Sequence, residues 1–179
     1  MRALVFAFTL ILSGCASQPD YRAEAAPPET VASVELDRYL GKWYEIARYP
    51  NWFERNCQGV TAEYSIRPDG NIGVLNTCRA ETPDGKPRTA EGRARIVEGS
   101  KNSKLRVKFA PGWVPFAEGD YWILHLEDDY SAALVGDPSG KYLWILGREK
   151  ALAPAVLTKI KGRAEALGYD ASKLVMVEQ

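Results

Sequence analysis

Eight short segments rich in β-branched and aromatic residues follow one another along the chain, and turn sequences such as Asp69-Gly70 separate most of them. Successive strands that are joined by short turns pair as antiparallel neighbours. Eight such strands can close into a barrel, which removes the exposed sheet edges. We therefore predict an all-β fold, an eight-stranded antiparallel up-and-down β-barrel. Its strands are expected at residues 43–49, 59–66, 72–79, 89–97, 104–109, 120–126, 131–135 and 142–147.

One amphipathic helix is expected near the C-terminus. Pro154 suits the first turn of a helix, and Gly168 suits the position just beyond its end. A single apolar stripe runs between them, formed by Val156, Leu157, Ile160, Ala164 and Leu167. Such a stripe must be buried, so we expect the helix to pack on the outside of the barrel. Residues 173–177 are expected to form a last short strand beside it.

The N-terminal segment is expected to lie outside the fold. Residues 3–12 form an apolar run that is too short to span a bilayer but suits a signal peptide. Leu12-Ser13-Gly14-Cys15 resembles the bacterial lipobox, whose cysteine is acylated after cleavage; a plain cleaved signal is the alternative. We expect a lipoprotein signal peptide at 1–14, a lipidated Cys15 with a flexible tether at 15–30, and one folded domain at 31–179.

The charges and the cysteines exclude some classes of function. The chain has 23 basic and 23 acidic side chains, so it lacks the basic excess of a nucleic-acid-binding protein. In an exported chain, Cys57 and Cys78 are expected to form a disulfide, with a free catalytic thiol as the alternative. The single histidine, His125, stands in no cluster with metal-ligand spacing. We therefore expect no metal site and no cofactor. His125 has the inward parity of its strand, and we expect it to be a core residue near the closed end rather than a ligand contact.

Two motifs carry a resemblance to a known family. Gly41-Lys42-Trp43-Tyr44 matches the lipocalin motif G-x-W-[YF], and residues 142–148 resemble the last lipocalin strand, which ends in an arginine. Phe53-Glu54-Arg55 favours the bacterial outer-membrane lipocalins and their apolipoprotein D relatives. The family's middle T-D-Y motif is matched only in part by residues 127–130. The resemblance implies that Trp43 plugs the closed end of the barrel and that Arg148 lies across its indole face, a cation–π contact.

The alternation of a strand predicts which side chains face the barrel interior. If Trp43 points inward, Glu45, Ala47 and Tyr49 should follow it, while Tyr44 and Ile46 should face the helix and Arg48 should reach solvent. A filled core and a ligand pocket both fit this apolar set, and the family resemblance favours the pocket. The predicted ligand-lining residues are Ala47, Tyr49, Val60, Ala62, Tyr64, Val74, Asn76, Ala94, Val107, Phe109, Tyr121, Ile123, Ala133, Val135, Tyr142 and Trp144.

The resemblance implies a lipid-binding function. We expect a protein anchored to the outer membrane through Cys15, with its barrel facing the periplasm, that stores or transports a fatty acid or a lysophospholipid. No catalytic residue is recognised, so we expect a binding protein; an enzyme that acts on a lipid and an interaction lipoprotein with a filled barrel are the alternatives. The apolar loop at residues 110–117 would contact lipid, guard the mouth of the barrel or form a homodimer patch.

Overall fold

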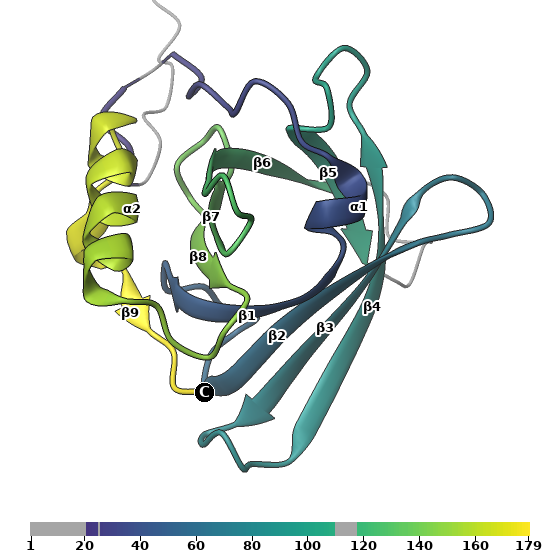
Figure 1. Ribbon diagram of the computed structural model, residues 1–179. Coiled ribbons are helices and arrows are strands. Elements are labelled where there is room, and N and C mark those ends of the chain that lie inside the picture. Colours follow the sequence, from purple (N-terminus) through teal and green to yellow (C-terminus); the bar gives the residue numbers. More distant parts are fainter. Residues whose placement is uncertain (1–20, 25, 110–117) are drawn as a thin grey trace, which may run out of the picture.

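The computed structural model describes residues 21–24, 26–109 and 118–179. Within them, eight antiparallel strands form a closed barrel (Figure 1), as predicted. The strands pair in chain order from β2 to β8, and β1 pairs with both β8 and β2 to complete the circle. The strands are β1 (Gly41–Arg48), β2 (Cys57–Ile66), β3 (Ile72–Ala80), β4 (Pro87–Ile96), β5 (Lys104–Phe109), β6 (Glu118–Leu126), β7 (Ala132–Gly136) and β8 (Leu143–Gly147).

The predicted helix is present as α2 (Pro154–Ala166), with its proline in the first turn and Gly168 in a left-handed conformation just after the end. Ile160 and Ala164 are fully buried in an apolar cluster together with outward-facing residues of β1, β6, β7 and β8. In Figure 1 the helix lies beside these strands and leaves β3 and β4 uncovered on the far side of the barrel. The helix therefore covers one part of the outer wall.

The segment after α2 returns to the barrel. A 3-10 turn, η1 (Ala171–Lys173), leads into a short strand, β9 (Val175–Met176), which pairs with Ala47 and Arg48 of β1. The following residues then bridge to β2, because the amide of Gly59 donates to the carbonyl oxygen of Glu178 over 2.6 Å. Direct pairing of β1 with β2 ends at Tyr44 and Thr61. The C-terminal segment thus lies between the second half of β1 and the first half of β2.

One end of the barrel is covered by α1 (Leu36–Tyr39). Chain direction puts the start of β1 and the ends of β2, β4 and β6 at this end. The turn after β6 holds α1 in place: Tyr130 accepts a hydrogen bond from the amide of Glu35 over 2.9 Å, and Arg38 lies 4.0 Å above its ring. The connections from β1 to β2 and from β7 to β8 lie at the opposite end, which we call the mouth.

The segment before α1 also contacts the barrel. The side chain of Arg22 is buried, and its Nε donates to the carbonyl oxygen of Leu167 at the end of α2 over 2.9 Å. The amide of Val31 donates to Ile123 of β6 over 3.0 Å. Part of the predicted tether therefore packs against the domain, while the boundary at residue 31 stays a prediction.

Candidate functional site

The closed end of the barrel is built around Trp43. Its indole is fully buried, and the guanidinium carbon of Arg148 lies 3.8 Å from the ring centroid. Arg148 also donates to the carbonyl oxygens of Lys42, Arg38 and Tyr39 over 2.8, 2.6 and 3.0 Å. Gly41 adopts a φ of +88°, in the left-handed region, so the chain enters β1 beside this guanidinium. These contacts tie α1, β1 and β8 together as a floor.

Three tyrosine hydroxyls lie above that floor. Tyr121 is hydrogen-bonded to Tyr39 over 2.7 Å and to Tyr64 over 3.0 Å. Burial raises the pKa of Tyr64 to about 12 and raises the pKa of Tyr39 and Tyr121 as well. All three stay neutral near pH 7, so they provide hydrogen-bonding groups without adding charge to the interior.

The prediction that Ala47 and Tyr49 line the interior is wrong. The register between β1 and β8 shifts between Glu45 and Ala47, which marks a β-bulge. The bulge places Ile46 and Ala47 both on the outer wall, in the cluster under α2. Tyr49 lies in the same outer cluster, and its hydroxyl donates to the carbonyl oxygen of Asp170 over 3.1 Å.

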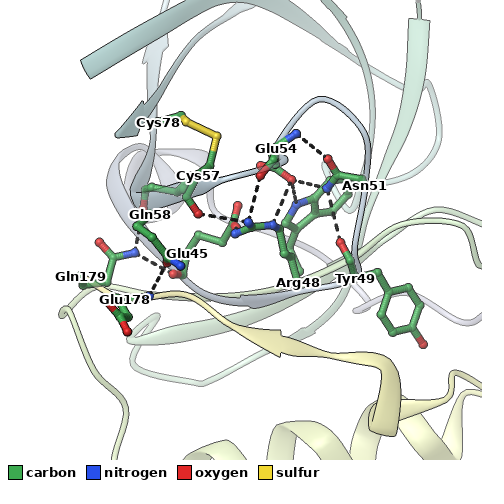
Figure 2. Close-up of polar contacts among 12 residues, drawn as sticks. Glu45, Arg48, Tyr49, Asn51, Glu54, Cys57, Gln58, Cys78, Glu178 and Gln179 are labelled. Carbon is green, nitrogen blue, oxygen red and sulfur yellow. Dashed lines mark hydrogen bonds and ion pairs between the residues drawn. A yellow bond between two sulfur atoms is a disulfide. The ribbon is translucent and has the colours of Figure 1, made fainter. Parts of the chain in front are cut away.

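The same bulge turns Arg48 inward, so the expectation that it reaches solvent is also wrong. Its side chain is 9% exposed, and its Nη1 lies 2.8 Å from Oε1 of Glu45 (Figure 2). Its Nη2 donates to the carbonyl oxygens of Glu54 and Cys57 over 3.0 and 3.1 Å. Arg48 therefore holds the start of β2 and the connection before it against β1.

A second carboxylate completes this charged cluster. Oε2 of Glu54 lies 3.9 Å from Nε of Arg48. It accepts hydrogen bonds from Nε1 of Trp144, over 3.2 Å, and from the side-chain Nδ2 of Asn51. Burial raises the pKa of Glu45 well above its ordinary value, and the nearby Glu54 raises it further, while Arg48 opposes both effects. The guanidinium of Arg48 thus forms ion pairs with two carboxylates, those of Glu45 and Glu54, near the mouth.

A pocket of about 360 Å³ opens beside the charged cluster, between the connection from β1 to β2 and Val175 of β9. Arg48, Glu54 and Trp52 line it. The indole of Trp52 is 75% exposed, and it begins a row of aromatic rings whose centroids lie 5.6 Å apart: Trp52, Phe53, Tyr142 and Trp144. The row leads from the exposed rim at Trp52 to Trp144, whose indole donates a hydrogen bond to Glu54.

Most other predicted lining residues lie in one apolar cluster inside the barrel. These are Ala62, Tyr64, Val74, Ala94, Val107, Phe109, Tyr121, Ile123, Ala133, Val135 and Trp144. Val60 lies instead in a separate cluster with Cys57 and Val177 of the C-terminal segment. Asn76 pairs in register with Ala62, and its buried Oδ1 has no hydrogen-bond partner among the described residues. Such an orphaned acceptor favours a site that a polar group of a ligand or a water completes.

The disulfide between Cys57 and Cys78 is present, with 5.2 Å between the Cα atoms. A bulge in β2, between Gln58 and Thr61, brings Cys57 into register with Ala80 and so beside Cys78.

His125 lies on the outer wall, because a register shift follows Ile123. Its Nε2 lies 2.8 Å from Oε1 of Glu127, and the other carboxylate oxygen of Glu127 bonds Lys159 of α2. The only histidine of the chain therefore lies outside the interior cluster, and the expectation that it is an inward core residue is wrong.

Three predictions lie outside the described residues: the signal peptide at 1–14, the lipidation of Cys15 and the role of the loop at 110–117. Among residues 21–24, 26–109 and 118–179, no group of three or more metal-ligating side chains is found. In the same ranges, no helix is long and apolar enough to cross a membrane.

Residues 34–179 match the family model of the lipocalin-like domain. The chain is 39% identical to the outer membrane lipoprotein Blc of Vibrio cholerae over 181 residues, which cover 100% of this chain and 99% of that protein. It is 31% identical to apolipoprotein D of Mus musculus, with 98% of this chain and 94% of that protein covered.

Among solved structures, insecticyanin from the tobacco hornworm Manduca sexta has the same fold. Its TM-score is 0.69 at 22% identity, and the match covers 89% of this chain and 88% of that one. The closed barrel and its outer helix agree with these matches. The chain therefore belongs to the lipocalin family.

Proposed function

We propose that this protein binds a single-chain amphiphile, a fatty acid or a lysophospholipid, inside the barrel and stores or transports it for membrane maintenance. The observation that supports this most is an apolar barrel interior with polar groups at both ends. Tyrosine hydroxyls lie above the floor, and the ion pair of Glu45 and Arg48 lies near the mouth. Each methylene group buried in such an interior contributes about 0.8 kcal/mol, so an alkyl chain of modest length binds without directed chemistry.

The aromatic row at the mouth supports a path for such a ligand. Trp52 and Phe53 are exposed, whereas Trp144 contacts the inner cluster. On this proposal a lipid tail moves along these rings from the rim to the interior. We therefore propose that the tail lies inside and that the head group stays near the mouth.

We further propose that Cys15 is acylated and holds the barrel at the outer membrane, on its periplasmic side. The lipobox-like sequence before Cys15 supports the anchor, and the full-length match to an outer membrane lipoprotein of Vibrio cholerae supports the location. Two or more acyl chains give stable anchoring, whereas one chain gives only marginal binding.

A binding role is also proposed in place of catalysis. The two cysteines of the domain are joined to each other, and the single histidine is bonded to Glu127 outside the barrel. Neither arrangement supplies a nucleophile with an activating base.

Uptake of ligand by the delipidated protein tests the proposal. Purified protein, stripped of lipid in organic solvent and refolded, should take up a fluorescent fatty acid or a lysophospholipid at one site per chain. Uptake of neither ligand by a folded sample would exclude lipid binding. Hydrolysis or isomerisation of the added lipid would favour the enzyme instead.

A further inference from the structure

Two pairs of like charges lie directly opposite each other on the outer wall of the barrel. In the register between β4 and β5, Arg93 faces Lys108 and Arg95 faces Arg106. Their neighbours Ala94, Leu105 and Val107 belong to the inner cluster, so the four cations all point outward. Like charges in directly opposed positions destabilise a sheet. Two such pairs in succession concentrate positive charge on this part of the wall.

These cations surround a groove. A hollow of about 260 Å³ is lined by Arg93, Arg95, Arg106 and Lys108, together with Glu118 and Asn71. The Nε of Arg106 is buried and has no hydrogen-bond partner among the described residues, although Oε2 of Glu118 lies 3.5 Å away. An unsatisfied donor in a cationic groove favours an anionic partner.

Carboxylates in the wall already neutralise part of this charge. Oε2 of Glu118 lies 3.2 Å from Nη2 of Arg95, and Oδ1 of Asp120 lies 3.0 Å from Nη1 of Arg106. Arg93 has only a looser contact, 3.7 Å from Asp69. No ion pair to Lys108 is found in the described part of the chain. Glu118 therefore occupies one side of the groove, and Arg93 and Lys108 remain available on the other.

Among the described residues, α2 and the cluster under it do not cover the wall around the groove. The cluster under α2 draws its strand residues from β1, β6, β7 and β8, and none of β3, β4 or β5 contributes to it. Leu75 of β3, an outward-facing residue, is 36% exposed on the same wall. A surface that combines basic side chains with an exposed apolar side chain suits the interface of an anionic membrane, where both kinds of group find partners.

We propose that this groove is a second binding site, which docks the outer wall of β3 to β6 on the phosphate groups of an anionic lipid surface. The site is separate from the barrel interior and does not depend on the ligand proposed above. This contact turns the barrel side-on to the membrane, with the phosphates of lipid head groups meeting Arg93 and Lys108, the two cations that the wall's carboxylates leave most available.

Binding to vesicles tests the proposal. The unacylated full chain is sedimented with vesicles of phosphatidylcholine that contain phosphatidylglycerol, and with vesicles of phosphatidylcholine alone, at low and physiological ionic strength. Binding should need the anionic lipid and should weaken with salt. The double variant Arg93→Gln/Lys108→Gln keeps the contacts of Arg95 and Arg106, and it should bind about fivefold more weakly for each charge removed.

Removal of Glu118 gives the sharper test. Glu118→Gln frees Arg95 and Arg106 and should strengthen vesicle binding about fivefold. Glu165→Gln on α2 makes the same change in net charge away from the groove, and Lys86→Gln/Lys150→Gln matches the double variant; both should have little effect. Equal effects of the groove variants and their matched controls would overturn the proposal. Groove-dependent binding of free inorganic phosphate, without binding of anionic vesicles, would overturn the assignment to lipid.

Discussion

Glu45 and Arg48 form a buried ion pair, with 2.8 Å between Oε1 and Nη1, across the β-bulge of β1. Three positions along a regular strand would put the two side chains on opposite faces of the sheet. The extra residue in the bulge puts them on the same face, while Ile46 and Ala47 both turn toward α2. One local irregularity therefore creates the charged cluster near the mouth and shapes the surface on which the helix packs.

Removing the cation of this cluster should strongly destabilise the fold. Arg48→Met leaves Glu45 and Glu54 buried beside each other, and breaking a buried ion pair in this way costs about 3–5 kcal/mol of unfolding free energy. Urea unfolding of the variant measures the loss. Arg55→Met, at an exposed neighbouring position, is the control and should change stability little. A loss below about 1 kcal/mol for Arg48→Met would mean that the cluster is not buried in the way described.

Stability should depend on pH through Glu45. Its pKa is raised in the folded protein, so the folded state holds this proton more tightly than the unfolded state does. The contribution of Glu45 to the unfolding free energy should therefore fall as pH rises above its ordinary pKa of 4.5. Glu45→Gln removes this contribution, so the variant should gain stability relative to the original protein from pH 4.5 upward. Glu63→Gln, on the exposed face of β2, should show no such trend, and a constant difference for Glu45→Gln would refute the assignment.

The floor of the barrel should depend on the guanidinium of Arg148 and not only on its charge. Arg148→Ala removes the contact with Trp43 and the hydrogen bonds to three carbonyl oxygens, and we expect a loss of about 2 kcal/mol or more. Arg148→Lys keeps the charge but not the planar group, so it should recover only part of the loss. Thermal unfolding followed by tryptophan fluorescence measures both variants. Full recovery by lysine would show that charge alone matters.

Filling the barrel should block ligand binding without unfolding the protein. Ala62 belongs to the inner cluster, and its neighbour Thr61 points to the other face of β2. Ala62→Phe should lower the affinity for a fluorescent fatty acid at least about tenfold, because the added ring takes the place of ligand carbons. Thr61→Phe, which places the same ring on the outside of the barrel, should bind as the original protein does. Equal binding by both variants would place the ligand elsewhere.

The regular parts of the fold could be predicted from the sequence because they depend on local signals. The turn residues, the alternation along strands and the apolar stripe of α2 were enough for the barrel and its helix. The bulges in β1 and β6 could not be predicted in this way, since a register shift depends on the partner strand. The inward direction of Arg48 and the outward place of His125 both follow from these shifts.

The charged groove on the outer wall was hidden in the sequence for a similar reason. The chain has equal numbers of basic and acidic side chains, and Arg93 and Lys108 lie 15 positions apart on two successive strands, whose exact register the sequence does not specify. Only the pairing of β4 with β5 brings their charges together. Net charge therefore says little about a local cluster that a sheet register creates.

Native mass spectrometry of the protein after mild extraction tests the central claim most directly. We expect the intact protein to carry one amphiphile per chain, which collisional activation releases as a fatty acid or a lysophospholipid. We expect the Ala62→Phe variant to be detected without a bound lipid and the Thr61→Phe variant to be detected with one. Empty protein in all three samples, from cells in which the domain is folded and its disulfide intact, would contradict lipid binding in the barrel.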